Sequence, residues 1–169
     1  MSRLSKTLQG LILSGASALV IFSQFLDEKE GNRLTAYRDS HGLATICRGL
    51  TVIGEKPVVM GMTLTAAECA RFNQAEADKA LALTDRYITV PLTEPQKAGV
   101  ASFCAYSIGI GKCRNSTFFR KINAGDRQGA CNEIRKWIFD GGKDCRIRAN
   151  NCAGQPKRRE AERNLCLTG

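Results

Sequence analysis

Residues 30–49 read EGNRLTAYRDSHGLATICRG, and this stretch places two carboxylates and a hydroxyl at set intervals. Glu30 is followed nine residues later by Asp39, and Thr45 comes six residues after that. Tyr, Thr, Ile and Val side chains continue to residue 53, interrupted by Ser-His-Gly and Ile-Gly-Glu, which is typical of short antiparallel strands joined by turns. We therefore expect two or three short strands here, preceded by a helix or turn that ends near Gly31.

A carboxylate pair of this kind can cleave a sugar bond. One carboxyl group protonates the leaving oxygen, and the other helps water to attack or stabilises the developing positive charge. The acid needs a raised pKa, which burial beside apolar groups supplies. A nearby threonine hydroxyl can hold the attacking water. Alone, the spacing is a weak signal, because carboxylates nine residues apart also occur in solvated turns.

Downstream of residue 64 the sequence is mostly helical. Thr65 with Glu68, and Thr93 with Gln96, form two capping-box signatures that predict helix starts. The expected helices cover residues 65–90, 93–111, 115–125, 126–139 and 156–167, with a loop over 141–155. The sequence therefore predicts an α+β fold.

The predicted organisation is a two-lobed domain over residues 28–169, with a cleft between the lobes. A small antiparallel sheet lobe covers 28–64, a long connecting helix covers 65–90, and a helical lobe covers 91–169. A separate N-terminal segment covers 1–27.

Residues 7–26, TLQGLILSGASALVIFSQFL, contain no charge. As one helix at about 1.5 Å per residue they would span a hydrocarbon core of about 30 Å. Arg3 and Lys6 precede this run and acidic residues follow it, which places the N-terminus inside and the rest outside. A cleaved signal peptide, a permanent anchor and a marginal anchor that later leaves the membrane all fit, and a buried first helix of a soluble protein is the alternative. That alternative lacks the usual polar face.

The eight cysteines are an even count in a short chain, which favours disulfides in an oxidising compartment. A zinc site is disfavoured because the chain has no C-x-x-C and one histidine, His41. The pairing is open. Cys104–Cys113 and Cys145–Cys152 could close short loops and Cys47–Cys69 could tie the sheet lobe to the long helix, in which case Cys131–Cys166 would pin the last helix.

The formal net charge of +9 favours a polyanionic partner, such as a cell wall, an anionic lipid or a nucleic acid. Nucleic acid is disfavoured, since the chain has no long Lys/Arg tract and only three Tyr and one Trp for base stacking.

The opening stretch resembles the E-G-x-R-x-x-x-Y-x-D-x-x-G-x-x-T-x-G segment of the phage-type lysozymes, the endolysins of glycoside hydrolase family 24. Gly31, Arg33, Tyr37 and Gly42 match as well, whereas Cys47 stands where the pattern usually has Gly. The resemblance continues through NSTFFRKINAGD, KWIFDGGK and RREAERNLCL, and covers most of residues 28–169. The N-terminus resembles that of the signal-anchor-release branch.

The resemblance implies a muramidase that cleaves the β-1,4 bond between N-acetylmuramic acid and N-acetylglucosamine in peptidoglycan for host lysis, without metal or cofactor. It implies Glu30 as general acid, Asp39 as catalytic carboxylate and Thr45 as the residue that positions water. It also implies a monomer that is exported, tethered to the bacterial inner membrane by an uncleaved anchor, and then released into the periplasm in active form. Residues 1–46 contain no cysteine, which disfavours activation by disulfide exchange with the anchor.

Two other functions stay open. A catalytically idle wall-binding protein would bind peptidoglycan without forming product. A cationic membrane-disrupting protein would act through residues 1–26 and would not need Glu30.

Overall fold

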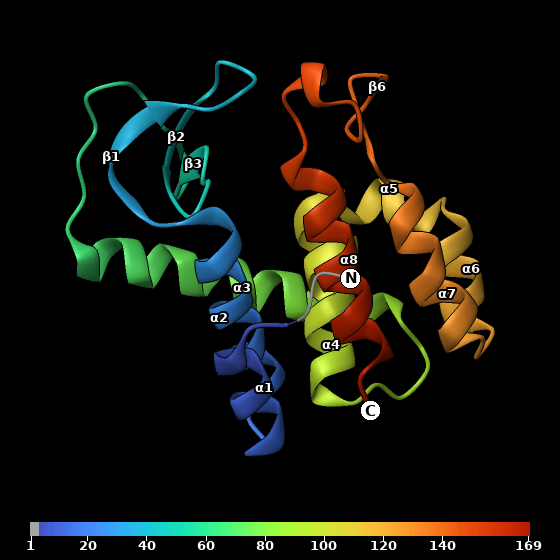
Figure 1. Cartoon of the computed structure of the whole chain (residues 1–169). Helices are drawn as coiled ribbons and strands as arrows, with labels where there is room; N and C mark the ends of the chain where they lie inside the picture. The colour runs from blue at the N-terminus through green and yellow to red at the C-terminus, as the bar shows by residue number, and fades with distance from the viewer. Residues whose placement is uncertain (1–3) are drawn as a thin grey trace. The chain divides into compact units, whose positions relative to one another are not determined.

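The computed structural model describes residues 4–169, and Arg3 of the predicted anchor lies outside them. The chain divides into two compact units. One unit is Ser23–Lys79, and the other combines the chain up to Phe22 with Ala80–Gly169. Helices α2 (Ala18–Glu30) and α3 (Ala66–Tyr87) each begin in one unit and end in the other (Figure 1).

The 23–79 unit contains two small antiparallel sheets beside parts of α2 and α3. Its strands are β1 (Arg33–Arg38), β2 (Ala44–Cys47), β3 (Val52–Ile53) and β4 (Lys56–Pro57). β1 pairs with β2, and β3 pairs with β4. A bulge interrupts the first pair between Arg33 and Tyr37. Within the bulge, β1 pairs with a different segment: the Ala36 N–H donates to the Met62 carbonyl at 2.8 Å.

The core of this unit is small and contains one disulfide. Ile46 and Leu50 pack with Val58, and Cys47 bonds to Cys69 in the same cluster. Since a small core stabilises a fold weakly, a covalent link within it is of particular value.

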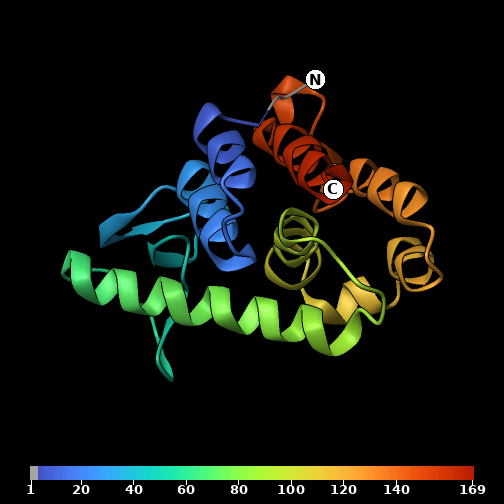
Figure 2. The ribbon, with the colours of Figure 1, turned by 90° about the horizontal axis from the view of Figure 1, so that it is seen from below.

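The larger unit is mainly helical. Its elements from α4 onward are α4 (Glu94–Val100), η1 (Ala101–Ser107), α5 (Ile110–Arg114), α6 (Thr117–Asn123), α7 (Arg127–Glu133), η2 (Ile134–Lys136), β5 (Phe139–Asp140), β6 (Lys143–Asp144), η3 (Arg148–Asn150) and α8 (Gly154–Leu167). α4 lies in the middle of this unit, with α8 along one side (Figure 2). The two helices approach closely at Gly99, where an added Cβ would lie 2.8 Å from the Cys166 backbone nitrogen.

The core of the helical unit lies among α4, η1 and α6–α8. Phe103 meets Phe118 edge to face at 5.0 Å and Trp137 at 5.8 Å. Two disulfides, Cys104–Cys113 and Cys131–Cys166, are part of the same cluster. The fourth, Cys145–Cys152, closes the loop after β6. All four pairings suggested by the sequence are therefore confirmed.

Several predicted helix boundaries were wrong. The expected helix over 93–111 is three elements, because η1 is a π-helical segment and Gly109, with a φ of 84°, starts the next helix. The expected helix over 126–139 gives way at Glu133 to a 3-10 turn. The expected loop over 141–155 contains half of a β-hairpin and a 3-10 turn. The last helix begins at Gly154, since Pro156 is tolerated within a first turn.

The uncharged N-terminal run forms two helices in this structure. α1 (Lys6–Leu13) and the start of α2 are separated at residues 14–17, where Gly15 adopts a φ of 73°. One face of α2 is buried through Ala18, Ile21 and Phe22. Between residues 4 and 169, no single helix combines the length and the apolar character needed to cross a membrane.

Candidate active site

Asp39 organises the turn that joins β1 to β2. Its Oδ1 accepts the backbone N–H groups of His41 and Leu43, both at 2.9 Å. The turn closes with the Asp39 N–H donating to the Leu43 carbonyl at 3.0 Å, and Gly42 supplies the positive φ of 79° that the turn requires. The backbone therefore fixes one carboxylate oxygen, Oδ1, and the second oxygen, Oδ2, takes no part in these two hydrogen bonds.

Thr45 lies beside that second oxygen. It is 2% exposed, and its Oγ1 lies 3.5 Å from Asp39 Oδ2 and 3.1 Å from the Leu43 carbonyl oxygen. A hydroxyl has one proton but two lone pairs. When its proton goes to Leu43 or Asp39, the oxygen can still accept a hydrogen bond from a water molecule next to Asp39.

Glu30 is the last residue of α2 and is partly buried. Its Oε2 lies against Gly49, where an added Cβ would come within 3.4 Å of that oxygen. Gly49 also has a φ of 80°, so both the backbone and the close approach favour glycine there. Gly49 was not predicted to have a role at the site; its position directly after Arg48 in a turn was the available signal.

The Arg48–Gly49 turn is held to the helices on either side of it. Arg48 Nε donates to Asp27 Oδ1 at 2.6 Å, one turn before Glu30 on α2. The Arg48 N–H donates to Asn73 Oδ1 on α3 at 3.2 Å. These contacts fix the position of the turn against which the Glu30 carboxylate lies.

Cys47 explains the one departure from the resemblance noted above. Its φ is 57°, in the left-handed region that favours glycine. A cysteine thus occupies a backbone conformation that a glycine would adopt without strain. The disulfide to Cys69 holds the residue in that conformation.

The pKa of Tyr37 depends on the charges of both carboxylates, Glu30 and Asp39. Tyr37 pairs with Thr45 across the hairpin, and the Arg33 guanidinium lies 4.5 Å from its ring centre. Burial raises the pKa of the Tyr37 phenol above its usual value, Arg33 opposes this, and the charges of Glu30 and Asp39 both raise the pKa further. The structure therefore brings the three predicted residues around one strand pair.

This coupling gives a measurable test of the site. Replacing Glu30 with Gln, or Asp39 with Asn, removes a negative charge that disfavours the phenolate, so the pKa of Tyr37 should fall in each variant while staying raised by burial. The measurement is the ultraviolet titration of tyrosinate, with a Tyr37→Phe variant identifying the signal. An unchanged titration in both variants would contradict this placement of the carboxylates.

Comparison with known proteins places this chain in a family. The family described as "Phage lysozyme" matches residues 27–162. A SAR-endolysin of Escherichia phage 933W is 61% identical over 166 residues, covering 98% of this chain and 94% of the relative. A SAR-endolysin of Escherichia phage N15 is 59% identical over 167 residues, covering 97% and 94%. The chain belongs to the phage lysozyme family and is a glycoside hydrolase of the lysozyme (muramidase) class.

Solved structures agree with the fold. An endolysin from Escherichia coli O157:H7 phage FAHEc1 is similar with a TM-score of 0.73 and 33% identity, covering 89% of this chain and 90% of that one. The active form of P1 phage endolysin Lyz has the same fold, with a TM-score of 0.71 at 20% identity, covering 98% and 95%. The expected lysozyme-like α+β architecture is confirmed.

Proposed function

We propose that this protein is an endolysin that hydrolyses the β-1,4 bond between N-acetylmuramic acid and N-acetylglucosamine in peptidoglycan, as a monomer. Glu30 is the general acid, Asp39 the catalytic carboxylate and Thr45 the residue that positions water. The observation that carries the proposal is the hairpin turn. It fixes one oxygen of Asp39 with two backbone N–H groups and leaves the other beside the Thr45 hydroxyl.

The position of Glu30 supports its role. The end of α2 is tied by Asp27 to the Arg48–Gly49 turn, so Glu30 is held on a rigid element rather than on a mobile loop. A general acid must be held close to its target oxygen, and such a support restricts its motion.

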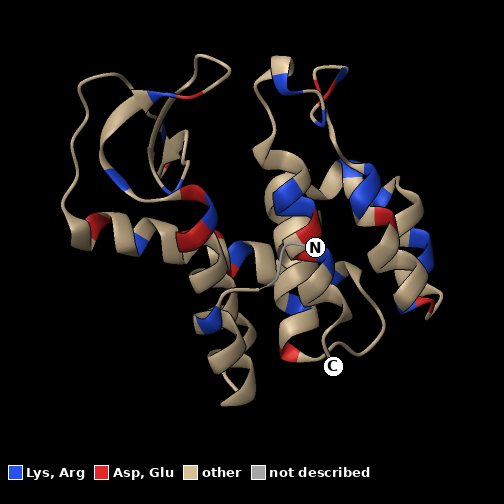
Figure 3. Ribbon diagram, in the orientation of Figure 1, with Lys and Arg blue, Asp and Glu red and all other residues tan. Residues whose placement is uncertain are grey.

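The charge distribution supports an anionic substrate. Residues 23–79 carry seven basic and eight acidic side chains, a net charge of −1, whereas the rest of the chain carries 18 and eight, a net charge of +10. Basic residues are spread over the helices of the larger unit (Figure 3). The positive electrostatic potential of these residues favours association with a polyanion such as the cell wall.

The bond is tested by digesting purified peptidoglycan and identifying the new reducing ends. N-acetylmuramic acid ends are the expected product. N-acetylglucosamine ends would overturn the bond assignment, and binding without new ends would favour an idle wall-binding protein.

We also propose that residues 1–27 first insert in the bacterial inner membrane as an uncleaved signal anchor and that the active form follows their release into the periplasm. The relatives carry the name SAR-endolysin. In the present structure Leu13 is 88% exposed and Val20 46% exposed, so the segment has more apolar surface than this fold buries.

Activation on release has a direct test. Glu30 lies four residues after Leu26, so an inserted anchor would hold Glu30 at the membrane surface and keep the site from forming. Protein reconstituted in lipid vesicles should therefore hydrolyse soluble peptidoglycan fragments more slowly than detergent-free protein. Equal rates would remove the activation step from the proposal.

A further inference from the structure

Two contacts hold the start of α2 against α4 and η1. The backbone N–H of Ala18 donates to Glu94 Oε2 at 2.5 Å, across 76 residues of sequence. The ring of Phe22 meets the ring of Tyr106 edge to face, with centroids 5.8 Å apart. Ala18 and Phe22 are four residues apart and lie on the same face of the helix. The same face therefore makes both contacts.

The Ala18–Glu94 hydrogen bond can form only when the N-terminal run is broken. In one unbroken helix over 7–26, the Ala18 N–H would donate to the carbonyl of Ser14, four residues earlier. Here the chain leaves the helix after Leu13, and Ala18 is the first residue of a new one. Its N–H is one of the groups that a helix start leaves without an intrahelical acceptor, and Glu94 supplies that acceptor.

The charge of Glu94 suits this position. Glu94 is the first residue of α4, and its carboxylate also lies at the first residue of α2. Helix N-termini carry partial positive charge, so one carboxylate stabilises two helix starts. A glutamine would keep the acceptor oxygen but lose most of the electrostatic part.

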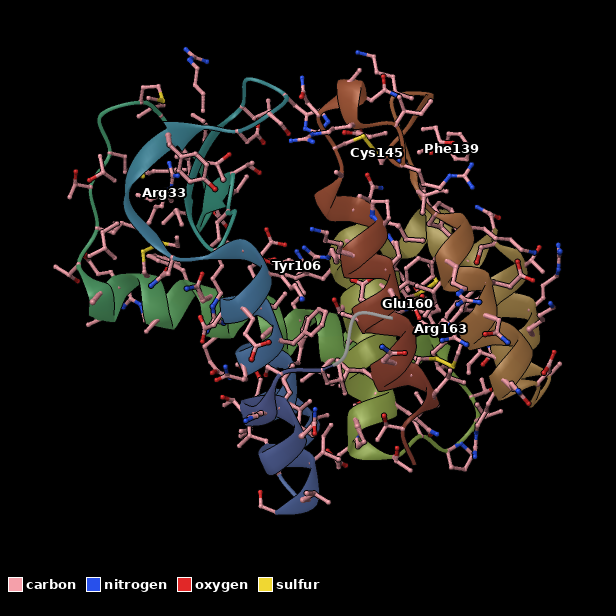
Figure 4. The ribbon with its side chains drawn as sticks, viewed as in Figure 1. Arg33, Tyr106, Phe139, Cys145, Glu160 and Arg163 are labelled. Carbon is pink, nitrogen blue, oxygen red and sulfur yellow. A yellow bond between two sulfur atoms is a disulfide. The ribbon has the colours of Figure 1, made fainter. Side chains whose placement is uncertain are left out.

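Tyr106 is itself held in place by buried polar contacts. Glu162 on α8 is fully buried and accepts hydrogen bonds from Ser102 at 2.7 Å and Ser107 at 3.0 Å. These serines are five residues apart, and the π-helical turn of η1 brings both to one carboxylate oxygen. Tyr106 lies on this segment (Figure 4). The Arg158 guanidinium on α8 is 6.0 Å from the centre of its ring.

We propose that Glu94 is a positioning residue: it caps α2 in the released form and so holds the helix whose last residue is Glu30. This rests on the proposed function, in which residues 1–27 leave the membrane and Glu30 is the acid. A helix is stiff over the 13 residues of α2, so a fixed start restricts the motion of its end. Tyr106 adds an apolar contact to the same helix, through the ring of Phe22.

The test compares Glu94→Ala with wild type in detergent-free, full-length protein. Amide hydrogen exchange at residues 18–22 should become about tenfold faster, because the helix start loses its anchor. The kcat on peptidoglycan should fall about threefold to tenfold at a temperature well below unfolding, with KM unchanged. Glu94→Gln, which keeps an acceptor oxygen, should recover most of both effects.

Glu68→Ala is the matched control. Glu68 is also a first-turn glutamate, at the start of α3, where it accepts the Thr65 N–H at 2.8 Å. It should leave exchange at residues 18–22 and kcat close to wild type. If Glu94→Ala moves neither readout more than Glu68→Ala does, Glu94 stabilises only α4 and the inference is wrong.

The hydrogen-exchange readout separates this inference from the proposed function. If wild type forms no N-acetylmuramic acid ends, the proposed function fails, while exchange at residues 18–22 still decides the capping role of Glu94. If Glu94→Ala does not fold, the comparison of Glu94→Gln with wild type decides it instead. Glutamine keeps an acceptor oxygen but has no charge, so exchange at residues 18–22 should be faster than in wild type, by less than the change expected for alanine. Exchange equal to wild type would then contradict the capping role.

Discussion

Glu30→Gln is expected to lower kcat for peptidoglycan hydrolysis by a factor of about 10² to 10⁴, the usual contribution of a positioned general acid. The amide has nearly the size of the carboxyl group, so it fits against Gly49 as Glu30 does, at the end of an otherwise unchanged α2. It cannot give a proton to the leaving sugar oxygen. The loss should therefore appear in kcat, while substrate binding and the unfolding midpoint stay close to wild type.

Glu28→Gln is the matched control for that variant. Glu28 stands two residues earlier on the same helix, is exposed, and accepts a hydrogen bond from Gln24 at 3.0 Å. The same change in charge at this position should leave kcat within about twofold of wild type. A Glu30→Gln enzyme with more than a tenth of wild-type kcat would show that another group is the acid. If both variants still cleared cells with no new reducing ends, membrane disruption would be the better explanation.

The parts of the fold that depend on local sequence could be predicted. The capping boxes at Thr93–Gln96 and Thr65–Glu68 both form, and both start helices. Short loops between cysteines led to two of the disulfide pairs, Cys104–Cys113 and Cys145–Cys152, because loop closure is a local property. The hairpin around Asp39 and Thr45 followed from turn residues between β-forming side chains.

The parts that depend on distant partners could not be predicted. The π-helical turn of η1 places Ser102 and Ser107 on Glu162, which lies 60 residues from Ser102 along the chain. The break in the N-terminal run occurs among Ser, Gly and Ala residues that would also fit a continuous helix, and Glu94 lies 76 residues from Ala18. At the site, the sequence marked Glu30, but not the Asp27–Arg48 ion pair that fixes the turn beside it. Each of these contacts joins segments whose own sequences give no sign of the other.

The disulfide beside the site gives the second large effect. Replacing Cys47 and Cys69 with serine removes a link that closes a loop across 22 residues, and should lower the free energy of unfolding by about 3 kcal/mol. Cys47 also has a φ of 57°, a conformation that costs a side chain other than glycine about 1 kcal/mol. The Cys47→Gly, Cys69→Ser protein should therefore lose only about 2 kcal/mol, although it lacks the same bond.

Denaturant unfolding of the two double variants measures the difference. The matched control is Cys104–Cys113, because Cys104 lies within η1 and not among the residues with positive φ. At position 104 glycine costs about 0.5–1 kcal/mol relative to a better helix former. The Cys104→Gly, Cys113→Ser protein should therefore be less stable than the protein with serine at both positions. Glycine is thus expected to stabilise at position 47 and to destabilise at position 104. The same sign at both positions would mean that the backbone of residue 47 is not strained. The disulfide to Cys69 would then serve only to close the loop beside the active-site hairpin.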